Sequence, residues 1–137
     1  MPFTLHPNFD SKIFIADLPL CRLLLENNSH YRWLFLIPRR DHIIHIMDLS
    51  TEDQLQLLKE IDYVQKLLWT QFCPYRLNVA AIGNKTPQLH LHLIARFEID
   101  PAWPGTVWDH PSQESYTENA LQKVLDSIAV YLSQHPL

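Results

Sequence analysis

The sequence is poor in residues that define several familiar classes of protein. It contains only two glycines, Gly83 and Gly105, so the glycine-rich turns of a dinucleotide-binding fold or a P-loop are missing. Its two cysteines, Cys21 and Cys73, are too few for a four-cysteine zinc site or a disulfide framework. Charge is nearly balanced as well: the net charge of −4 provides no basic field for nucleic acid, which we exclude as a partner.

Long apolar stretches are also lacking. The strongest apolar run, Trp33 to Ile37, is far shorter than the roughly 20 residues of a membrane helix. Residues 1–14 show no basic stretch followed by an apolar one, as a secretory signal would. We therefore expect no membrane association and a cytoplasmic location, with both cysteines reduced.

The periodicity of the apolar residues predicts an α+β fold. With 47% hydrophobic residues, residues 1–137 fit a single domain with a real core. A capping pattern at Thr51 opens a helix over 51–72, with Leu55, Leu58, Ile61, Val64, Leu68 and Phe72 on one face. A C-terminal helix is expected over 117–133. Strands are expected at 13–17, 20–25, 33–37, 77–82 and 88–97. Because the strands come in runs, they predict an antiparallel sheet of about five strands.

The segment 88–93 is the most informative part of the chain. Polar and apolar residues alternate along it, which is typical of a half-buried strand. Gln88, His90 and His92 would then share one face, roughly 6.6–7 Å apart, with leucines on the opposite face.

Three interpretations of this strand compete. The polar side chains could form a solvent-facing surface. His90 and His92 could be half of a metal site, completed from His42, His45 and Glu26, although none of these has a recognisable spacing. Finally, a neutral imidazole could act as a nucleophile on phosphorus, because its pKa near 6.5 leaves a lone pair free at neutral pH.

The run Gln88-Leu-His90-Leu-His92-Leu-Ile resembles the signature of the histidine triad (HIT) family, His-φ-His-φ-His-φ-φ, where φ is hydrophobic. The flanks agree, with a strand that ends at Pro38 before basic residues, a long helix, and a strand and loop before the histidines. The runs 78–84 and 103–108 are similar to a bacterial subgroup with Gln-x-His-x-His. The resemblance covers roughly residues 12–108.

This resemblance implies a HIT-like fold and a nucleotide hydrolase or transferase. His90 would attack the α-phosphorus of a phosphoanhydride or phosphoramidate, such as a dinucleoside polyphosphate or an AMP conjugate, and carry the nucleotidyl group. His92 would orient phosphate oxygens, and backbone amides near His90 would stabilise developing charge. The family needs no metal or other cofactor and is usually homodimeric, and we expect a purine nucleotide as substrate.

One position departs from the family signature. Gln88 stands where the first histidine is expected, and an amide cannot carry a proton that titrates near neutrality. Turnover would then be slower or need a better leaving group. The alternative is a nucleotide-binding module with little or no turnover.

The family pattern also implies residues that bind the nucleotide. These are Glu26 or Asn27, at the end of a strand where a ribose-binding residue is common, and Asn78 and Asn84 on the approach to the histidines. Flanking residues have two interpretations each. Arg39, Arg40 and Lys85 could pair with polyphosphate or be solvated, and Trp103 and Trp108 could cover the pocket or fill the core. We expect the remaining histidines, His6, His30, His110 and His135, at the surface.

Overall fold

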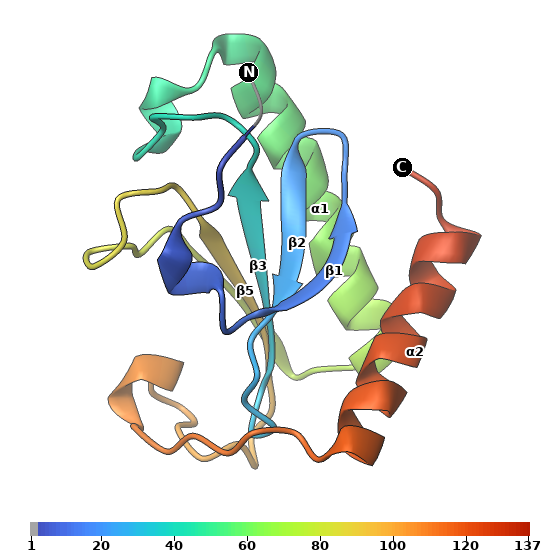
Figure 1. Ribbon diagram of the computed structural model, residues 1–137. Helices are drawn as coiled ribbons and strands as arrows, with labels where there is room; N and C mark the ends of the chain where they lie inside the picture. Colours follow the sequence, from blue (N-terminus) through green and yellow to red (C-terminus); the bar gives the residue numbers. More distant parts are fainter. Residues whose placement is uncertain (1–2) are drawn as a thin grey trace.

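The computed structural model describes residues 3–137 and is built on a five-stranded antiparallel sheet (Figure 1). The spatial order of the strands is β1-β2-β3-β5-β4, with each neighbouring pair antiparallel. The strands are β1 (Ile13–Asp17), β2 (Cys21–Leu25), β3 (Arg32–Pro38), β4 (Arg76–Ala80) and β5 (Leu91–Arg96). The predicted α+β fold with an antiparallel sheet of five strands is confirmed.

Two helices cover one face of this sheet. The long helix α1 (Thr51–Phe72) crosses behind the sheet in Figure 1, and the C-terminal helix α2 (Glu118–Gln134) packs beside it. The described part of the chain also contains three short 3-10 helices: η1 (Pro7–Phe9), η2 (Ile46–Asp48) and η3 (Val107–Asp109). The first residue before α1, Ser50, provides the N-cap by accepting a hydrogen bond from the Asp53 amide at 3.1 Å, so the cap lies one residue earlier than predicted.

The buried face of α1 differs in part from the predicted one. Leu55 and Leu58 are 59% and 63% exposed, whereas Leu57, Val64, Leu67 and Leu68 are buried with Glu60 among them. The carboxylate of Glu60 accepts hydrogen bonds from the amides of Leu20 and Cys21, both at 2.8 Å. Because this buried acid is tied to the turn before β2, the true inward stripe contains a charged residue. Of the predicted face, Val64 and Leu68 are buried, and Ile61 and Phe72 pack against the core. Only Leu55 and Leu58 were assigned to the inward face wrongly.

Alternation along β3 and β5 gives the sheet two different faces. Leu34 and Leu36 of β3, with Leu91 and Leu93 of β5, point toward the helices into a core rich in leucine. The residues between them point the other way into an aromatic cluster, which consists of Phe9, Leu24, Tyr31, Trp33, Phe35, Ile37, Ile94 and Val107. Within residues 3–137, no α-helix packs over this aromatic face, which is covered instead by η1, the β4–β5 loop (residues 81–90) and the segment around η3 (Figure 1).

Strand β5 begins at Leu91, three residues later than predicted. Gln88 and His90 therefore lie in the β4–β5 loop rather than in the strand. The loop is held to the rest of the protein by the amide of Leu89, which donates to the carbonyl of Ile43 at 2.9 Å. Leu89 still points into the leucine core, so the predicted alternation holds as far as this residue.

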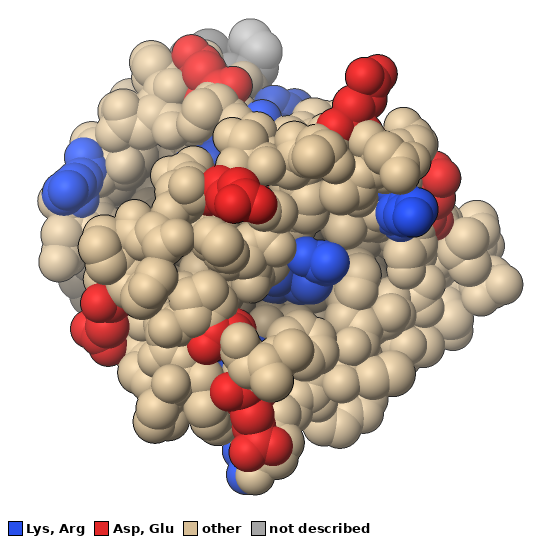
Figure 2. Space-filling view, turned by 90° about the horizontal axis from the view of Figure 1, so that it is seen from below, with Lys and Arg blue, Asp and Glu red and all other residues tan. Residues whose placement is uncertain are grey.

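Among residues 3–137, no helix is both long enough and apolar enough to cross a membrane. Figure 2 shows the molecule from below, where Lys and Arg side chains are scattered among acidic and uncharged residues rather than gathered into one patch.

Candidate active site

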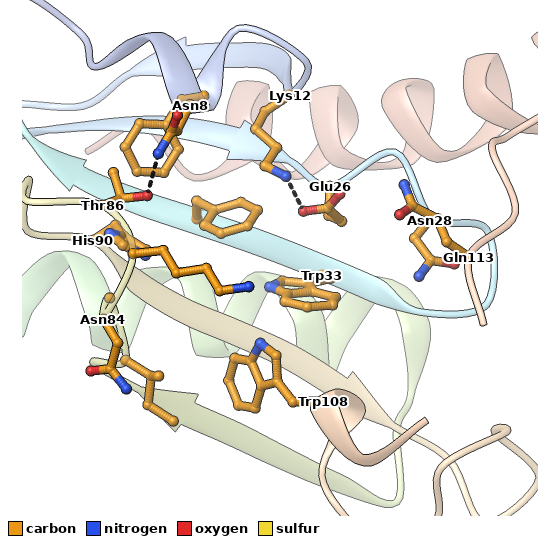
Figure 3. Close-up of a pocket in the computed structure, with 15 residues that line it drawn as sticks. Asn8, Lys12, Glu26, Asn28, Trp33, Asn84, Thr86, His90, Trp108 and Gln113 are labelled. Atoms are coloured by element: carbon orange, nitrogen blue, oxygen red, sulfur yellow. Dashed lines mark hydrogen bonds and ion pairs between the residues drawn. The ribbon is translucent and has the colours of Figure 1, made fainter. Parts of the chain in front are cut away.

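A cleft of about 610 Å³ opens on the aromatic face of the sheet (Figure 3). In Figure 3, His90, Asn84 and Thr86 lie at one end, Asn28 and Gln113 at the other, and Lys12 and Glu26 between them. Trp33 and Trp108 line the middle of the cleft. These residues come from the start of the chain, the end of β2, β3, the β4–β5 loop, η3 and the stretch before α2.

His90 has a defined tautomer. Its Nδ1 lies 2.8 Å from the carbonyl oxygen of Gln88. A carbonyl oxygen can only accept, so Nδ1 carries the proton and Nε2 carries the lone pair. The pKa of His90 is lowered from its ordinary value of 6.5, mainly by burial and also by the Lys12 ammonium, so the imidazole is neutral at pH 7. His90 is thus a neutral imidazole in the cleft wall with an unprotonated Nε2.

Three groups fix the position of the His90 ring. The Phe9 ring meets it edge to face at 5.0 Å between centroids, and the His92 ring lies 4.9 Å away. Gly83 closes the remaining side: a Cβ on this residue would lie 2.6 Å from Cε1 of His90, inside any permissible contact. Gly83 is therefore required for its missing side chain, which lets the loop backbone approach the imidazole.

Both ring nitrogens of His92 form hydrogen bonds within the protein. Nε2 lies 2.8 Å from the carbonyl oxygen of Ile82, and Nδ1 accepts a hydrogen bond from the Trp33 indole at 3.1 Å. Burial, with a smaller contribution from His90, lowers the pKa of His92 to about 4, so it stays neutral. His92 shares the cleft-facing side with His90, as predicted, but neither of its nitrogens is left for the phosphate contact expected from the resemblance.

An ion pair spans the centre of the cleft. Lys12, just before β1, places Nζ 2.6 Å from Oε2 of Glu26, which follows β2. The same ammonium lies 5.3 Å from the centroid of the Phe35 ring. The cleft thus presents a carboxylate and a cation above an aromatic floor, which suits a ligand with hydroxyl groups, an anionic group and a flat apolar part.

The structure brings only some of the predicted residues to this cleft. His90, Glu26 and Asn84 line it. Lys85 and Trp108, for which the sequence left a ligand contact and a structural role both open, line it as well. Between the two ribose candidates, the cleft wall contains Glu26. Asn27 points elsewhere, since its Oδ1 accepts a hydrogen bond from the Tyr116 amide at 3.0 Å.

Two other predicted residues are engaged outside the cleft. Asn78 accepts a hydrogen bond from Arg96 at 2.8 Å, and Arg96 forms a buried ion pair with Asp100, also at 2.8 Å. The Gln88 amide bonds the backbone of Thr4 and His6. Neither side chain lines the main cleft.

The flanking residues outside the cleft have local roles. Arg39 donates to the carbonyls of Leu18 and Pro19, and Arg40 pairs with Asp53 at 2.8 Å. Trp103 packs edge to face on Tyr75. Among the remaining histidines, His135 is exposed as expected, whereas His6, His30 and His110 are partly buried. Nε2 of His30 lies 3.0 Å from Oγ of Ser112.

Several cleft residues were not singled out from the sequence: Asn8, Phe9, Lys12, Asn28, Trp33, Phe35, Thr86 and Gln113. Alternation along β3 could have identified Trp33 and Phe35, because both lie on the face opposite Leu34. The N-terminal residues and Gln113 carry no local signal. They reach the cleft only because loops far apart in sequence meet over the sheet.

The metal alternative lacks a set of ligands. Within residues 3–137, no three His, Cys, Asp or Glu side chains are close enough together to hold a metal ion. His42 and His45 are exposed, Glu26 is paired with Lys12, and both nitrogens of His92 are occupied. The proposed combination of these residues is therefore wrong.

The model of the HIT domain matches residues 7–99, which is most of the chain. This chain belongs to the HIT family. Its fold is similar to a histidine triad protein of Bradyrhizobium japonicum, with 36% identity, a TM-score of 0.93, and coverage of 96% of this chain and 98% of that one. A Marinobacter aquaeolei histidine triad protein is also 36% identical, with a TM-score of 0.92 and 98% of each chain covered.

A third relative of known structure is a HIT protein of Sinorhizobium meliloti, 35% identical with a TM-score of 0.90, for which 95% of this chain and 97% of that one are covered. No curated protein matches this sequence. The resemblance to the HIT family is thus confirmed, while the subgroup with Gln-x-His-x-His stays a prediction.

Proposed function

We propose that this HIT protein is a nucleotide hydrolase or transferase in which Nε2 of His90 attacks the α-phosphorus of a phosphoanhydride or phosphoramidate. The observation that carries the proposal is the hydrogen bond from Nδ1 of His90 to the Gln88 carbonyl. It fixes the tautomer whose lone pair is on Nε2, and the lowered pKa of His90 keeps that lone pair free at neutral pH.

The chemistry proceeds in two displacements. In the first, Nε2 forms a P–N bond, the bond from phosphorus to the leaving group breaks, and the leaving group departs with the electron pair. The imidazole then carries a positive charge, which the Gln88 carbonyl stabilises through the Nδ1 proton. In the second, water attacks phosphorus, its proton goes to solvent, and the P–N bond breaks to restore His90 and release a nucleoside monophosphate.

The tautomer of His90 depends on the main chain at position 88. Every residue type has the carbonyl that accepts the Nδ1 proton, so replacing the first triad histidine by Gln88 leaves the nucleophile intact. His92 holds the β4–β5 loop in place by donating a hydrogen bond from Nε2 to the Ile82 carbonyl. We therefore assign His92 a positioning role.

The rest of the cleft suits a nucleoside. Glu26 is only 9% exposed, and its carboxylate can accept hydrogen bonds from two ribose hydroxyls. Trp33, Phe35 and Trp108 provide apolar surface for a purine base. Lys12, Lys85 and Asn84 are the polar groups available for phosphate oxygens.

A nucleotide-binding module without turnover is the alternative. It is favoured by one observation, that the Gln88 side chain is bonded to Thr4 and His6 and gives the cleft no titratable group for leaving-group departure. Such a protein would bind AMP yet release no product from any conjugate.

Product release separates the two. The protein and a His90→Asn variant are incubated with a diadenosine polyphosphate and an adenosine phosphoramidate, and AMP is measured by chromatography. We expect AMP from the protein and at least a thousandfold less from the variant, while both still bind AMP in calorimetry. Binding without AMP release by either would establish the module. Equal release by both would refute catalysis through His90.

The proposal also includes a homodimer in the cytoplasm. In the described sheet β4 is an edge strand, and Tyr75 and Val79 beside that edge are 45% and 41% exposed. Sedimentation equilibrium should give twice the chain mass of 16.2 kDa.

A further inference from the structure

We propose that the Gln88 side chain is a positioning residue, which fastens the N-terminal segment (residues 3–9) over the β4–β5 loop and thereby holds Phe9 against His90. Only the kinetic consequence of this clamp rests on the proposed function. The clamp itself is a matter of hydrogen bonds and order in the segment.

The clamp consists of two hydrogen bonds from one amide. Oε1 of Gln88 accepts from the His6 backbone amide at 2.8 Å, and Nε2 donates to the Thr4 backbone carbonyl at 3.0 Å. The partners fix the orientation of the amide, because a backbone N–H only donates and a carbonyl only accepts. In a parallel pair of strands, a residue opposite Leu5 would bond the same two groups, the Thr4 carbonyl and the His6 amide, through its own backbone. The Gln88 side chain therefore makes the hydrogen bonds that the backbone of a neighbouring strand would make.

The clamp is connected to the cleft through three residues. Nδ1 of His6 accepts from the Asn8 backbone amide at 3.0 Å, and the Asn8 side chain donates to Oγ1 of Thr86 at 2.9 Å (Figure 3). The next residue, Phe9, is 3% exposed and forms the wall of the cleft beside His90. Releasing the segment at Thr4 and His6 would loosen this wall without touching the nucleophile.

Apart from the clamp and the Asn8–Thr86 bond, the described residues provide only one further hydrogen bond between this segment and a distant part of the chain. The Thr4 amide donates to Asp41 at an exposed contact of 3.3 Å, and the side chains of Phe3 and Leu5 are only partly buried against the aromatic cluster. The two bonds of Gln88 are therefore a large share of what orders residues 3–6.

This role accounts for the departure from the triad signature. An imidazole has one donor and one acceptor in its neutral form, and they point away from each other across the ring. A primary amide presents its donor and acceptor side by side at the end of a longer side chain, so it can bond both backbone groups of an extended segment. Glutamine at position 88 thus contributes to the shape of the cleft and has no part in proton transfer.

The test uses Gln88→Met, which keeps length and volume but neither hydrogen bond. Gln122→Met on the exposed side of α2 is the matched control. Deuterium exchange of the backbone amides in residues 3–9 is measured by mass spectrometry, and KM and kcat are measured with a diadenosine polyphosphate. We expect exchange in residues 3–9 to become roughly tenfold faster in Gln88→Met only, and KM to rise roughly tenfold with kcat changed less than about threefold.

A second pair of variants removes the partner instead. His6 has φ −62° and ψ 139°, which proline can adopt without strain. His6→Ala and His6→Pro both remove the imidazole, but only His6→Pro also removes the backbone N–H that donates to Gln88. We expect His6→Pro to raise KM more than His6→Ala does, and Gln88→Met to add less in the His6→Pro background than in the unchanged protein.

The outcomes separate this inference from the proposed function. Unchanged exchange in residues 3–9 of Gln88→Met would overturn the clamp, whether or not the protein turns over any substrate. The clamp would also be overturned, in favour of direct catalysis by Gln88, if Gln88→Met lowered kcat without raising KM and did so equally in the unchanged protein and in His6→Pro. If no substrate is turned over, the exchange result and AMP affinity by tryptophan fluorescence still decide the clamp, while the proposed function alone fails.

Discussion

The two faces of the sheet are made from the same strands, yet they differ in the side chains that they present and in the elements that cover them. Toward the helices, β3 and β5 present leucines that are almost wholly buried, and these leucines are covered by the regular helices α1 and α2. Toward the cleft, the alternate positions present Trp33, Phe35 and His92, covered by loops and short 3-10 helices.

Both faces contribute to stability, but only the aromatic face also holds the cleft. The helix face buries aliphatic surface, the main favourable term in folding. The aromatic face leaves space for a ligand and holds the residues that would act on it. Substitutions on the two faces should therefore have different signatures.

The largest effect is expected on the helix face. Leu36 is fully buried in the leucine core, so Leu36→Ala should lower the free energy of unfolding by about 2–5 kcal/mol through lost burial and a residual cavity. Urea unfolding measures this. The exposed Leu55→Ala is the matched control and should cost less than about 1 kcal/mol. The AMP affinity of the folded Leu36→Ala protein should be unchanged, and a large loss of affinity would break the division between the faces.

The next effect is a pH dependence that comes from the cleft face. The pKa of His92 is about 4 in the folded protein, against 6.5 ordinarily. Between these two values, His92 is protonated in the unfolded chain but stays neutral in the folded protein. The stability is complete above pH 6.5 and is lost as the pH falls toward 4. Between pH 7 and pH 4, the protein should lose on the order of 3 kcal/mol more than His92→Asn, measured by urea unfolding. Equal losses in the two proteins would show that His92 is not the group responsible.

A smaller effect on binding and turnover is expected at Gly83. The Cβ of Gly83→Ala would lie 2.6 Å from Cε1 of His90, so the imidazole must move, and kcat/KM should fall about 10- to 100-fold. Gly105→Ala is a suitable control, because its Cβ would be crowded at 2.9 Å by Asp109, outside the cleft. If both variants lose activity equally, crowding alone rather than displacement of His90 is the cause.

The smallest effect concerns Glu26. Glu26→Gln keeps the shape but removes the charge that pairs with Lys12, and KM for a ribonucleotide substrate should rise several-fold. The same substitution should matter less with the 2′-deoxynucleotide substrate, in which one hydroxyl partner is already missing. A rise of equal size for both substrates would place the ribose elsewhere in the cleft.

Much of the fold could be predicted from periodicity. The strands and both helices were predicted within a few residues, because alternation and helical spacing report which side chains are buried. The face of α1 was mispredicted only at its N-terminal end, at Leu55 and Leu58. The inward position of Glu60 depends on the turn at Leu20 and Cys21, which only the tertiary structure brings near.

The candidate site was predictable only in part: His90, Glu26 and Asn84, which the sequence singled out, line the cleft. His90 and His92 follow from the motif, but Asn27, Asn78 and Gln88 turned out to bond elsewhere, with Tyr116, Arg96 and the N-terminal segment. Polar side chains beside a motif have no period that indicates their direction. Lys12 and Gln113 approach the cleft from loops with no sequence signal, so their place depends on long-range packing.

The central claim is that Nε2 of His90 becomes covalently bonded to phosphorus. Mixing the protein with a diadenosine polyphosphate, quenching within milliseconds in alkali and digesting it would trap the intermediate for mass spectrometry. We expect one adenylyl group per modified chain, on the peptide that contains His90, and none in His90→Asn. AMP release without any such adduct in the rapid quench, or an adduct that persists in His90→Asn, would contradict the claim.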